Sequence, residues 1–179
     1  NLTICEFGLF ARFDAVNILK NNLASIVTAI GLDHLDWLPK GQQNIKKIIF
    51  EKTSSLLNSK IIVAKQNSDE INNHIINTIS NNPSEKIMFN KDYNFTIKEN
   101  DFFYYEDQLG ALKLPKPNLI GDFQLENVST AIATARNLVN YKINDDHIIN
   151  GITKIKSIAR LQEIKEGKLK NLIKNNQLF

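Results

Sequence analysis

Cysteine is scarce in this sequence, because the 179 residues contain only Cys5. A single cysteine cannot form an internal disulfide, so a disulfide framework is excluded. Cys5 lies in the apolar run 2–5, where we expect a short strand and a small buried thiol. Long hydrophobic runs are also lacking, since no segment approaches the roughly 20 apolar residues needed to cross a bilayer, and no leader precedes the first predicted strand. We therefore expect a cytoplasmic protein without a membrane partner.

Charge of one sign is not in large excess. The 22 Lys and Arg residues and the 19 Asp and Glu residues give a net charge of +3, and no stretch gathers the cations into a stripe with interleaved aromatics. This balance argues against nucleic acid as a partner. The sequence also lacks a Gly-Lys-Ser or Gly-Lys-Thr phosphate loop, a cysteine pair for zinc and a Gly-x-Ser-x-Gly elbow. We do not expect these residues alone to form a complete nucleotide-dependent enzyme.

The sequence does contain regular apolar patterns, and its length suits one core. They predict strands at 2–5, 25–30 and 60–64 and helical segments at 14–19, 41–57 and 68–80. Strands that alternate with helices indicate a parallel sheet. Alternating residues then predict an antiparallel meander over 93–97, 102–105 and 109–114, followed by helices at 123–141 and after an N-cap at Asn144. We therefore expect an α/β fold with a mostly parallel sheet flanked by helices and a small antiparallel meander.

Polar residues follow the first two predicted strands. The run 25–30 leads into Gly31-Leu32-Asp33-His34, and the run 2–5 leads into Glu6 and a turn that carries Arg12 and Asp14. Because the carboxyl ends of parallel strands meet at one edge of a sheet, these side chains are candidates for a shared site. A carboxylate and an imidazole there suit a divalent cation, for which Mg²⁺ is the natural choice. The alternative is structural: Glu6 pairs with Arg12, and Asp33 or His34 caps the following turn.

Lys52 is unusual because the other members of its helical stripe are apolar, namely Ile45, Ile48, Ile49 and Leu56. Its side chain could extend past the edge of the core to solvent. Alternatively, its amine, or a modified form of it, reaches the same crevice as His34.

Two further residues are candidates for nucleotide contacts. Asn127 follows Gln124 near the start of the helix predicted at 123–141, where an amide could hold a polar base or sugar edge, although such residues are more often caps. Arg160 lies beyond the last predicted helix and could clamp a phosphate or form a surface ion pair.

Taken in order, five segments resemble the folylpolyglutamate synthase and dihydrofolate synthase branch of the Mur ligase family. They are Glu6-Phe7-Gly8-Leu9-Phe10-Ala11-Arg12-Phe13-Asp14-Ala15-Val16-Asn17, Ile30-Gly31-Leu32-Asp33-His34-Leu35-Asp36-Trp37-Leu38, Glu51-Lys52, Gln124-Leu125-Glu126-Asn127 and Arg160-Leu161-Gln162. The resemblance covers nearly the whole chain, and the Gly-Leu-Asp-His segment with its following Asp-Trp-Leu is its most specific part.

The resemblance implies a P-loop-NTPase-like central domain, incomplete here, of an ATP-dependent amide ligase. Such an enzyme phosphorylates a folate or pteroate carboxylate, and the amino group of glutamate then attacks the acyl phosphate. Folate or pteroate, glutamate and ATP are the implied small-molecule partners, Mg²⁺ is the implied cofactor, and the family is usually monomeric. Positive charge must gather around the transferred phosphoryl group.

The resemblance also implies roles for single residues. By position, Glu6 and His34 correspond to magnesium ligands, and Lys52 to a lysine that the family carbamylates into a further ligand. Asn127 corresponds to an adenine contact and Arg160 to a contact with the ATP phosphates. Arg12 and Asp14 correspond to residues of a loop on the substrate side.

The sequence departs from the family pattern at four positions in or next to the five segments. Phe10 and Ala11 stand where the family has two glycines, Val16 where a threonine is usual, and Phe123 where a histidine is usual.

The family's phosphate-binding loop is expected before residue 1 and its glutamate-binding domain after residue 179. The predicted domains are therefore 1–165, a partial central ATPase domain, and 166–179, the start of a connection to the next domain. On this hypothesis the chain alone does not turn over ATP.

Two alternatives to a folate ligase stay open. One keeps the chemistry and exchanges folate for a peptidoglycan precursor, as in other Mur ligases. The other is a non-catalytic protein that keeps the fold and binds nucleotide weakly or together with a partner chain.

Overall fold

The computed structural model describes residues 2–57, 59–98, 100–156 and 167–168. The chain divides into two compact units, residues 1–92 and 93–179, and each is described by itself. We call them the N-terminal unit and the C-terminal unit. Among the described residues, no helix combines the length and the apolar character that a membrane crossing requires.

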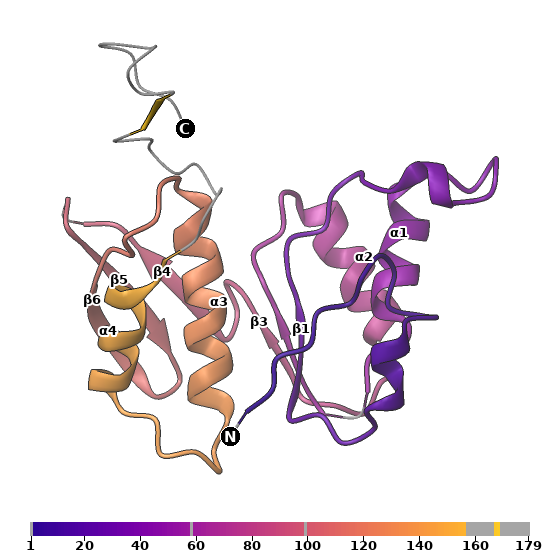
Figure 1. Cartoon of the computed structure of the whole chain (residues 1–179). Coiled ribbons are helices and arrows are strands. Elements are labelled where there is room, and N and C mark those ends of the chain that lie inside the picture. Colours follow the sequence, from indigo (N-terminus) through magenta and orange to yellow (C-terminus); the bar gives the residue numbers. More distant parts are fainter. Residues whose placement is uncertain (1, 58, 99, 157–166, 169–179) are drawn as a thin grey trace. The chain divides into compact units, whose positions relative to one another are not determined.

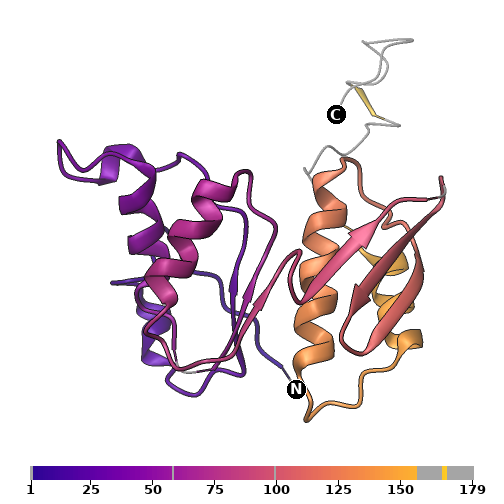
Figure 2. The ribbon, with the colours of Figure 1, turned by 180° about the vertical axis from the view of Figure 1, so that it is seen from behind.

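The N-terminal unit is built on a parallel sheet in the order β1-β2-β3. Its elements are the 3₁₀ helix η1 (Ala15–Ile18), β1 (Ala24–Val27), the 3₁₀ helix η2 (Leu35–Trp37), α1 (Ile45–Thr53), β2 (Lys60–Val63), α2 (Asp69–Ile79) and β3 (Lys86–Met88). Helices α1 and α2 lie together on one side of the sheet (Figures 1 and 2). Aliphatic residues from both helices and from the sheet form the core between them.

The C-terminal unit combines an antiparallel sheet with two helices. Strands β4 (Tyr93–Thr96), β5 (Phe102–Asp107) and β6 (Gly110–Pro115) form the meander, and α3 (Phe123–Asn137) and α4 (Asp145–Lys154) follow. Helix α3 packs against β4, and α4 packs against β6. The α/β class, the parallel sheet and the meander were all predicted from the sequence, and the structure confirms them.

Capping residues determine where several helices begin. The Asn44 side chain accepts a hydrogen bond from the Lys47 amide and starts α1, so the helix predicted at 41–57 is shorter than expected. Gly41 has a φ of +85°, outside the helical region. Ser68 caps α2 in the same way. Asn144 and His147 form a reciprocal capping box at the start of α4.

Three predictions of local structure were wrong, and one strand, β3, was not predicted. Residues 2–5 form no strand, and Cys5 is exposed, because this short run joins none of the sheet ladders in the described residues. Strand β1 ends at Val27, because the Ile30 amide instead donates to the Gln66 side chain. Helix α3 stops at Asn137 and leaves Val139 exposed, since Leu138 leaves the helical conformation. Strand β3, at three residues, is too short to give an alternating pattern.

Candidate functional site

His34 lies in the loop that follows β1. The Gln66 side chain accepts from the Ile30 amide at 3.0 Å and donates to the Ala64 carbonyl at 2.8 Å, which ties this loop to the end of β2. His34 itself has a φ of +58°, in the left-handed region. Its Nε2 lies 3.1 Å from an Asp33 carboxylate oxygen, and its amide donates to the other oxygen at 2.8 Å. The loop that carries His34 therefore follows the carboxyl end of β1 and is joined to the end of β2.

His34 also precedes a turn. It occupies the N-cap position of η2 but makes no side-chain cap, and its carbonyl accepts from the Trp37 amide at 3.1 Å. The structural alternative for this segment is thus realised in part, through the Asp33 carboxylate and the backbone. The imidazole takes no part in the cap.

Residues 8–14, which we call the substrate-side loop, are closed by Asp14. Its carboxylate accepts hydrogen bonds from the Gly8 and Val16 amides, each at 2.8 Å. The bonds from Val16 and then Gly8 lower the pKa of Asp14 below its ordinary value, because they favour the ionised form. Through the hydrogen bond from the Val16 amide, Asp14 also caps η1.

The two departures from the family's glycine pair are accommodated in this loop. Among the described residues, only His34 and Asn90 adopt a positive φ without being glycine, so Phe10 and Ala11 need no left-handed backbone. Ala11 is buried, and the Phe10 ring meets His34 edge to face, with ring centroids 6.2 Å apart.

Arg12 is bound to Glu51 of α1. Its Nε and Nη2 donate to the two carboxylate oxygens at 2.7 Å and 3.0 Å, and its amide donates to the Glu51 carbonyl at 3.1 Å. The alternative pairing of Arg12 with Glu6 is therefore wrong. Lys47 approaches the same carboxylate at 2.9 Å. Burial would raise the pKa of Glu51, but the hydrogen bonds and charges of Arg12 and Lys47 outweigh it and lower this pKa.

Lys52 reaches the substrate-side loop from α1. Its amine donates to the Leu9 carbonyl at 3.3 Å and lies 5.9 Å from the centre of the Phe10 ring. Since Phe10 also contacts His34, the structure places the Phe10 ring next to both Lys52 and His34. Lys52 is half-buried and joins α1 to the loop.

Glu6 is exposed and forms no ion pair with any residue that the structure describes. The described residues contain no group of three or more His, Cys, Asp and Glu side chains that could hold a metal ion. The Glu6 carboxylate suits Mg²⁺, whereas the His34 imidazole is a nitrogen ligand that this hard cation uses less often. An unmodified Lys52 amine is no ligand, because an ammonium group has only hydrogen-bond donors. Lys52 fits a metal site only as a carbamate. The assignment of metal ligands therefore stays a prediction.

The two nucleotide candidates fall in the C-terminal part of the chain. Asn127 is exposed on the first turns of α3, and its amide nitrogen lies 3.4 Å from the Gln124 side-chain oxygen. Gln124 is buried. Arg160 lies outside the described residues.

Sequence reasoning gave Glu51 no role, although the structure buries it and gives it two cationic partners. A signal was present in the spacing, because Glu51 lies four residues after Lys47 and three after the buried Ile48. His147 also had no assigned role, and it completes the cap of α4.

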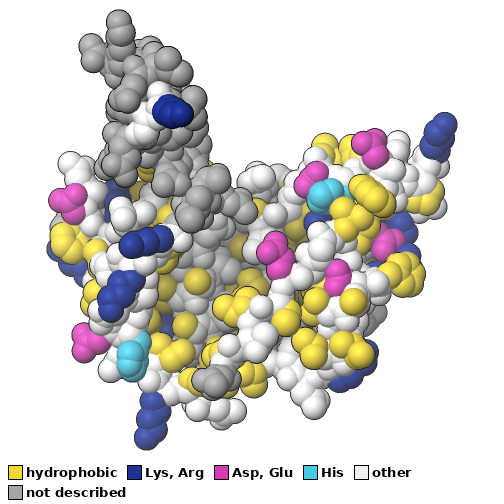
Figure 3. All heavy atoms as spheres, viewed as in Figure 1, with side chains coloured by type: hydrophobic (Ala, Val, Ile, Leu, Met, Phe, Trp, Pro, Cys, Tyr) yellow, Lys and Arg dark blue, Asp and Glu magenta, His cyan; other side chains and the backbone are white. Residues whose placement is uncertain are grey.

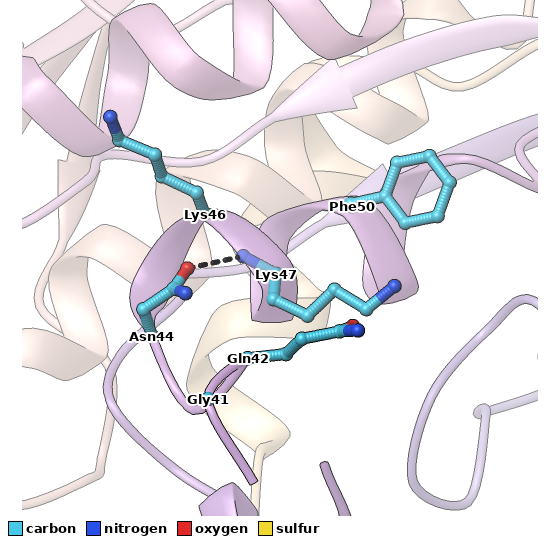
Figure 4. Close-up of a pocket in the computed structure, with 6 residues that line it drawn as sticks. All are labelled: Gly41, Gln42, Asn44, Lys46, Lys47 and Phe50. Atoms are coloured by element: carbon cyan, nitrogen blue, oxygen red, sulfur yellow. Dashed lines mark hydrogen bonds between the residues drawn. The ribbon is translucent and has the colours of Figure 1, made fainter. Parts of the chain in front are cut away.

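A shallow depression lies at the start of α1, lined by Gly41, Gln42, Asn44, Lys46, Lys47 and Phe50. In Figure 4, Gln42 and Lys47 point the same way and Lys46 points away from them.

The surface of the N-terminal unit also exposes large apolar side chains, and Figure 3 shows hydrophobic groups on the viewed face. The most exposed apolar side chains of the N-terminal unit are those of Ile4, Phe13, Ile18, Leu32 and Trp37.

Comparison with known proteins shows what this chain is similar to. No protein-family model matches it. It is 26% identical over 168 residues to dihydrofolate synthase/folylpolyglutamate synthase from Escherichia coli (strain K12), an alignment that covers 93% of this chain and 37% of that protein. The predicted resemblance is thereby confirmed.

Solved structures share this fold. E. coli FolC in complex with DHPP and ADP matches with a TM-score of 0.74 and 26% identity, covering 89% of this chain and 36% of FolC. The apo form of L. casei FPGS matches with a TM-score of 0.76 and 22% identity, covering 90% of this chain and 40% of that one. The chain therefore spans little more than a third of the length of its curated relative.

Proposed function

We propose that the protein to which these residues belong is an ATP-dependent ligase that joins glutamate to a folate or pteroate carboxylate. The observation that carries this proposal is the similarity to a folate ligase over 93% of the chain. FolC, which shares the fold, was solved with ADP and DHPP, so we assign ATP and a pteroate-like compound as ligands.

The proposed reaction has two steps. A carboxylate oxygen of the folate or pteroate attacks the γ-phosphorus of ATP, ADP leaves, and an acyl phosphate forms. The glutamate amine then attacks the acyl carbon, phosphate leaves, and the amine loses a proton as the amide forms. Because the chain spans 37% of its relative, we propose that the 179 residues alone do not complete this reaction.

Within it, we assign Glu6 and His34 as ligands of Mg²⁺, with Lys52 joining them as a carbamate. A magnesium ion held there would offset negative charge on the transferred phosphoryl group. Asn127 and Arg160 are assigned to ATP. Support for the first group comes from its placement, since His34 follows β1 and Lys52 reaches the loop that Glu6 precedes.

The test is a ligation assay on the complete protein. We expect ADP release that requires both a folate or pteroate and glutamate, together with a product one glutamate heavier by mass spectrometry. ADP release that requires a peptidoglycan precursor instead would overturn the folate assignment. Absence of ADP release with either kind of substrate, whether or not nucleotide binds, would favour a non-catalytic protein.

Single substitutions test the site. Glu6→Gln and His34→Ala should each abolish most of the ligation, because each removes an assigned ligand. The matched controls Glu70→Gln and His74→Ala change the same residue types on α2 and should retain it. Equal effects of the site and control variants would contradict the assignment.

A further inference from the structure

The substrate-side loop has an internal brace and an external anchor. The brace is the Asp14 carboxylate, which accepts from the Gly8 and Val16 amides. It fixes the shape of the loop and caps the short helix η1 that follows, but it does not join the loop to α1. The main anchor is the pair of Arg12 and Glu51, which are 39 positions apart in the sequence, and Lys52 of α1 adds one hydrogen bond to the Leu9 carbonyl.

The geometry of this anchor is specific. Two parallel N–H groups of the Arg12 guanidinium meet the two Glu51 oxygens, and a backbone hydrogen bond joins the same two residues. Paired bonds of this kind fix orientation as well as distance. Phe13 and Phe50 add to the restraint, because their ring centres lie 4.2 Å and 5.4 Å from the guanidinium carbon.

Glu51 is suited to this task because it cannot easily move. Its side chain is only 6% exposed, whereas that of Arg12 is 37% exposed. Lys47 holds the same carboxylate from the preceding turn of α1. The fixed partner is thus the acid on the helix, and the restrained partner is the arginine on the loop.

We propose that Glu51 is a positioning residue that acts through Arg12 to hold the substrate-side loop against α1. The proposal rests on the proposed function and on the assignment of this loop, from the family resemblance, to the side of the site where the folate or pteroate would bind. Loops are intrinsically more mobile than the elements they connect, and reacting groups must be held closely in place for ligation. Glu51 touches neither substrate nor reacting atoms in this role.

The first test uses the 179-residue chain and no substrate. Arg12→Met and Lys47→Met each remove one cation from Glu51, but only Arg12→Met removes the side-chain bonds that join Glu51 to the loop. By amide hydrogen exchange, we expect the Gly8 and Val16 amides to exchange roughly 10- to 100-fold faster in Arg12→Met, the equivalent of losing hydrogen bonds to a charged group. Lys47→Met should retain slow exchange. Equal exchange in the two variants would overturn the proposal.

Glu51→Gln keeps the shape of the side chain and removes its charge, and should also speed loop exchange. If this variant fails to fold, the Arg12→Met and Lys47→Met comparison still decides the question, because Glu51 remains in both. An unchanged loop in folded Glu51→Gln would overturn the proposal.

The second test uses the complete ligase. Glu51→Gln and Arg12→Met should raise the KM for the folate or pteroate roughly 10-fold, in line with one charged hydrogen bond, and leave the KM for ATP unchanged. Arg12→Lys, which keeps the charge without the fork, should recover part of the affinity. Equal increases in both KM values would overturn the role. A protein without ligase activity would overturn the proposed function, whereas the exchange test still decides whether Glu51 anchors the loop.

Discussion

In the N-terminal unit, the core between sheet and helices consists of aliphatic side chains and one methionine, and the candidate site residues lie at its edge, on loops and, for Lys52, on α1. In the C-terminal unit, Tyr93, Phe103 and Tyr105 are fully buried, and polar groups lie among them. The Tyr93 hydroxyl meets Thr130 at 3.2 Å, and the Tyr105 hydroxyl donates to Asp107 at 3.0 Å. Most polar side chains of the N-terminal unit thus lie outside its core, whereas the core of the C-terminal unit contains pairs of hydrogen-bonded polar side chains.

The difference assigns different work to the two units. Polar groups on loops can meet ligands, and an apolar core gives those loops a rigid base. Buried polar groups instead specify one packing arrangement, because each must keep its partner. Substitutions that break an ion pair should therefore have their largest effect where both partners are buried, as at Arg136 and Asp107 of the C-terminal unit. Those that remove aliphatic volume should act on the N-terminal unit.

Arg136→Ala should give the largest loss of stability. The Arg136 and Asp107 side chains are about equally buried, Nη2 donates to one carboxylate oxygen at 3.0 Å, and Nε lies 2.9 Å from the other as an ion-pair contact without hydrogen-bond alignment. Removing the arginine leaves the Asp107 charge buried and costs about 3–5 kcal/mol. Urea denaturation measures the loss in free energy of unfolding, and hydrogen exchange in α3 and β5 shows where the structure is weakened.

Asp145→Asn is the matched control for that change. Asp145 also faces Arg136, but at 3.8 Å and from an exposed position. Exposed pairs contribute about 1 kcal/mol or less. A loss in Asp145→Asn as large as in Arg136→Ala would contradict the view that burial makes the inner pair decisive.

Ile61→Ala should give the next largest loss, now in the N-terminal unit. Ile61 is fully buried in the central strand β2, and removing its side chain leaves a cavity that costs about 2–4 kcal/mol. Ile76→Ala on α2 is the control, because Ile76 is 40% exposed and should lose about 1 kcal/mol or less. Denaturation followed by hydrogen exchange in β2 compares them, and equal losses would argue against a core centred on β2.

The sequence predicts these cores better than it predicts the contacts around the site. Apolar periodicity identified α2, β2 and the meander, because each repeats a pattern over several residues. It wrongly predicted a strand at 2–5, because an apolar run does not reveal whether a neighbouring strand is available to pair with it. It missed β3, which has only three residues.

The same limit applies to the candidate site. His34 was predictable, because its place after β1 follows from local sequence. The binding of Arg12 to Glu51 was not, because the partners are far apart in the chain and many acids compete as partners for one arginine. Strand ends are thus visible in a sequence, whereas the ion pairs that orient them require the folded chain.

The smallest effect at neutral pH concerns Tyr93, whose ionisation matters only in alkali. Burial raises its pKa to about 12, although the hydrogen bond with Thr130 acts in the opposite direction. An unfolded tyrosine has a pKa of about 10. The neutral hydroxyl therefore contributes stability that is fully present below about pH 10 and is lost as the pH rises to about 12, because the unfolded chain releases its proton first.

Tyr93→Phe has no proton to release at this position, so its free energy of unfolding should fall less steeply between about pH 10 and pH 12. Burial also raises the pKa of Tyr105, so part of the slope will remain in this variant. Tyr141→Phe, at a more exposed tyrosine, is the control and should keep the full slope. Urea denaturation across this pH range measures the difference. Identical slopes in the two variants would mean that the Tyr93 hydroxyl is ionised as readily in the folded unit as in the unfolded chain, and that its burial does not distinguish this core from the aliphatic one.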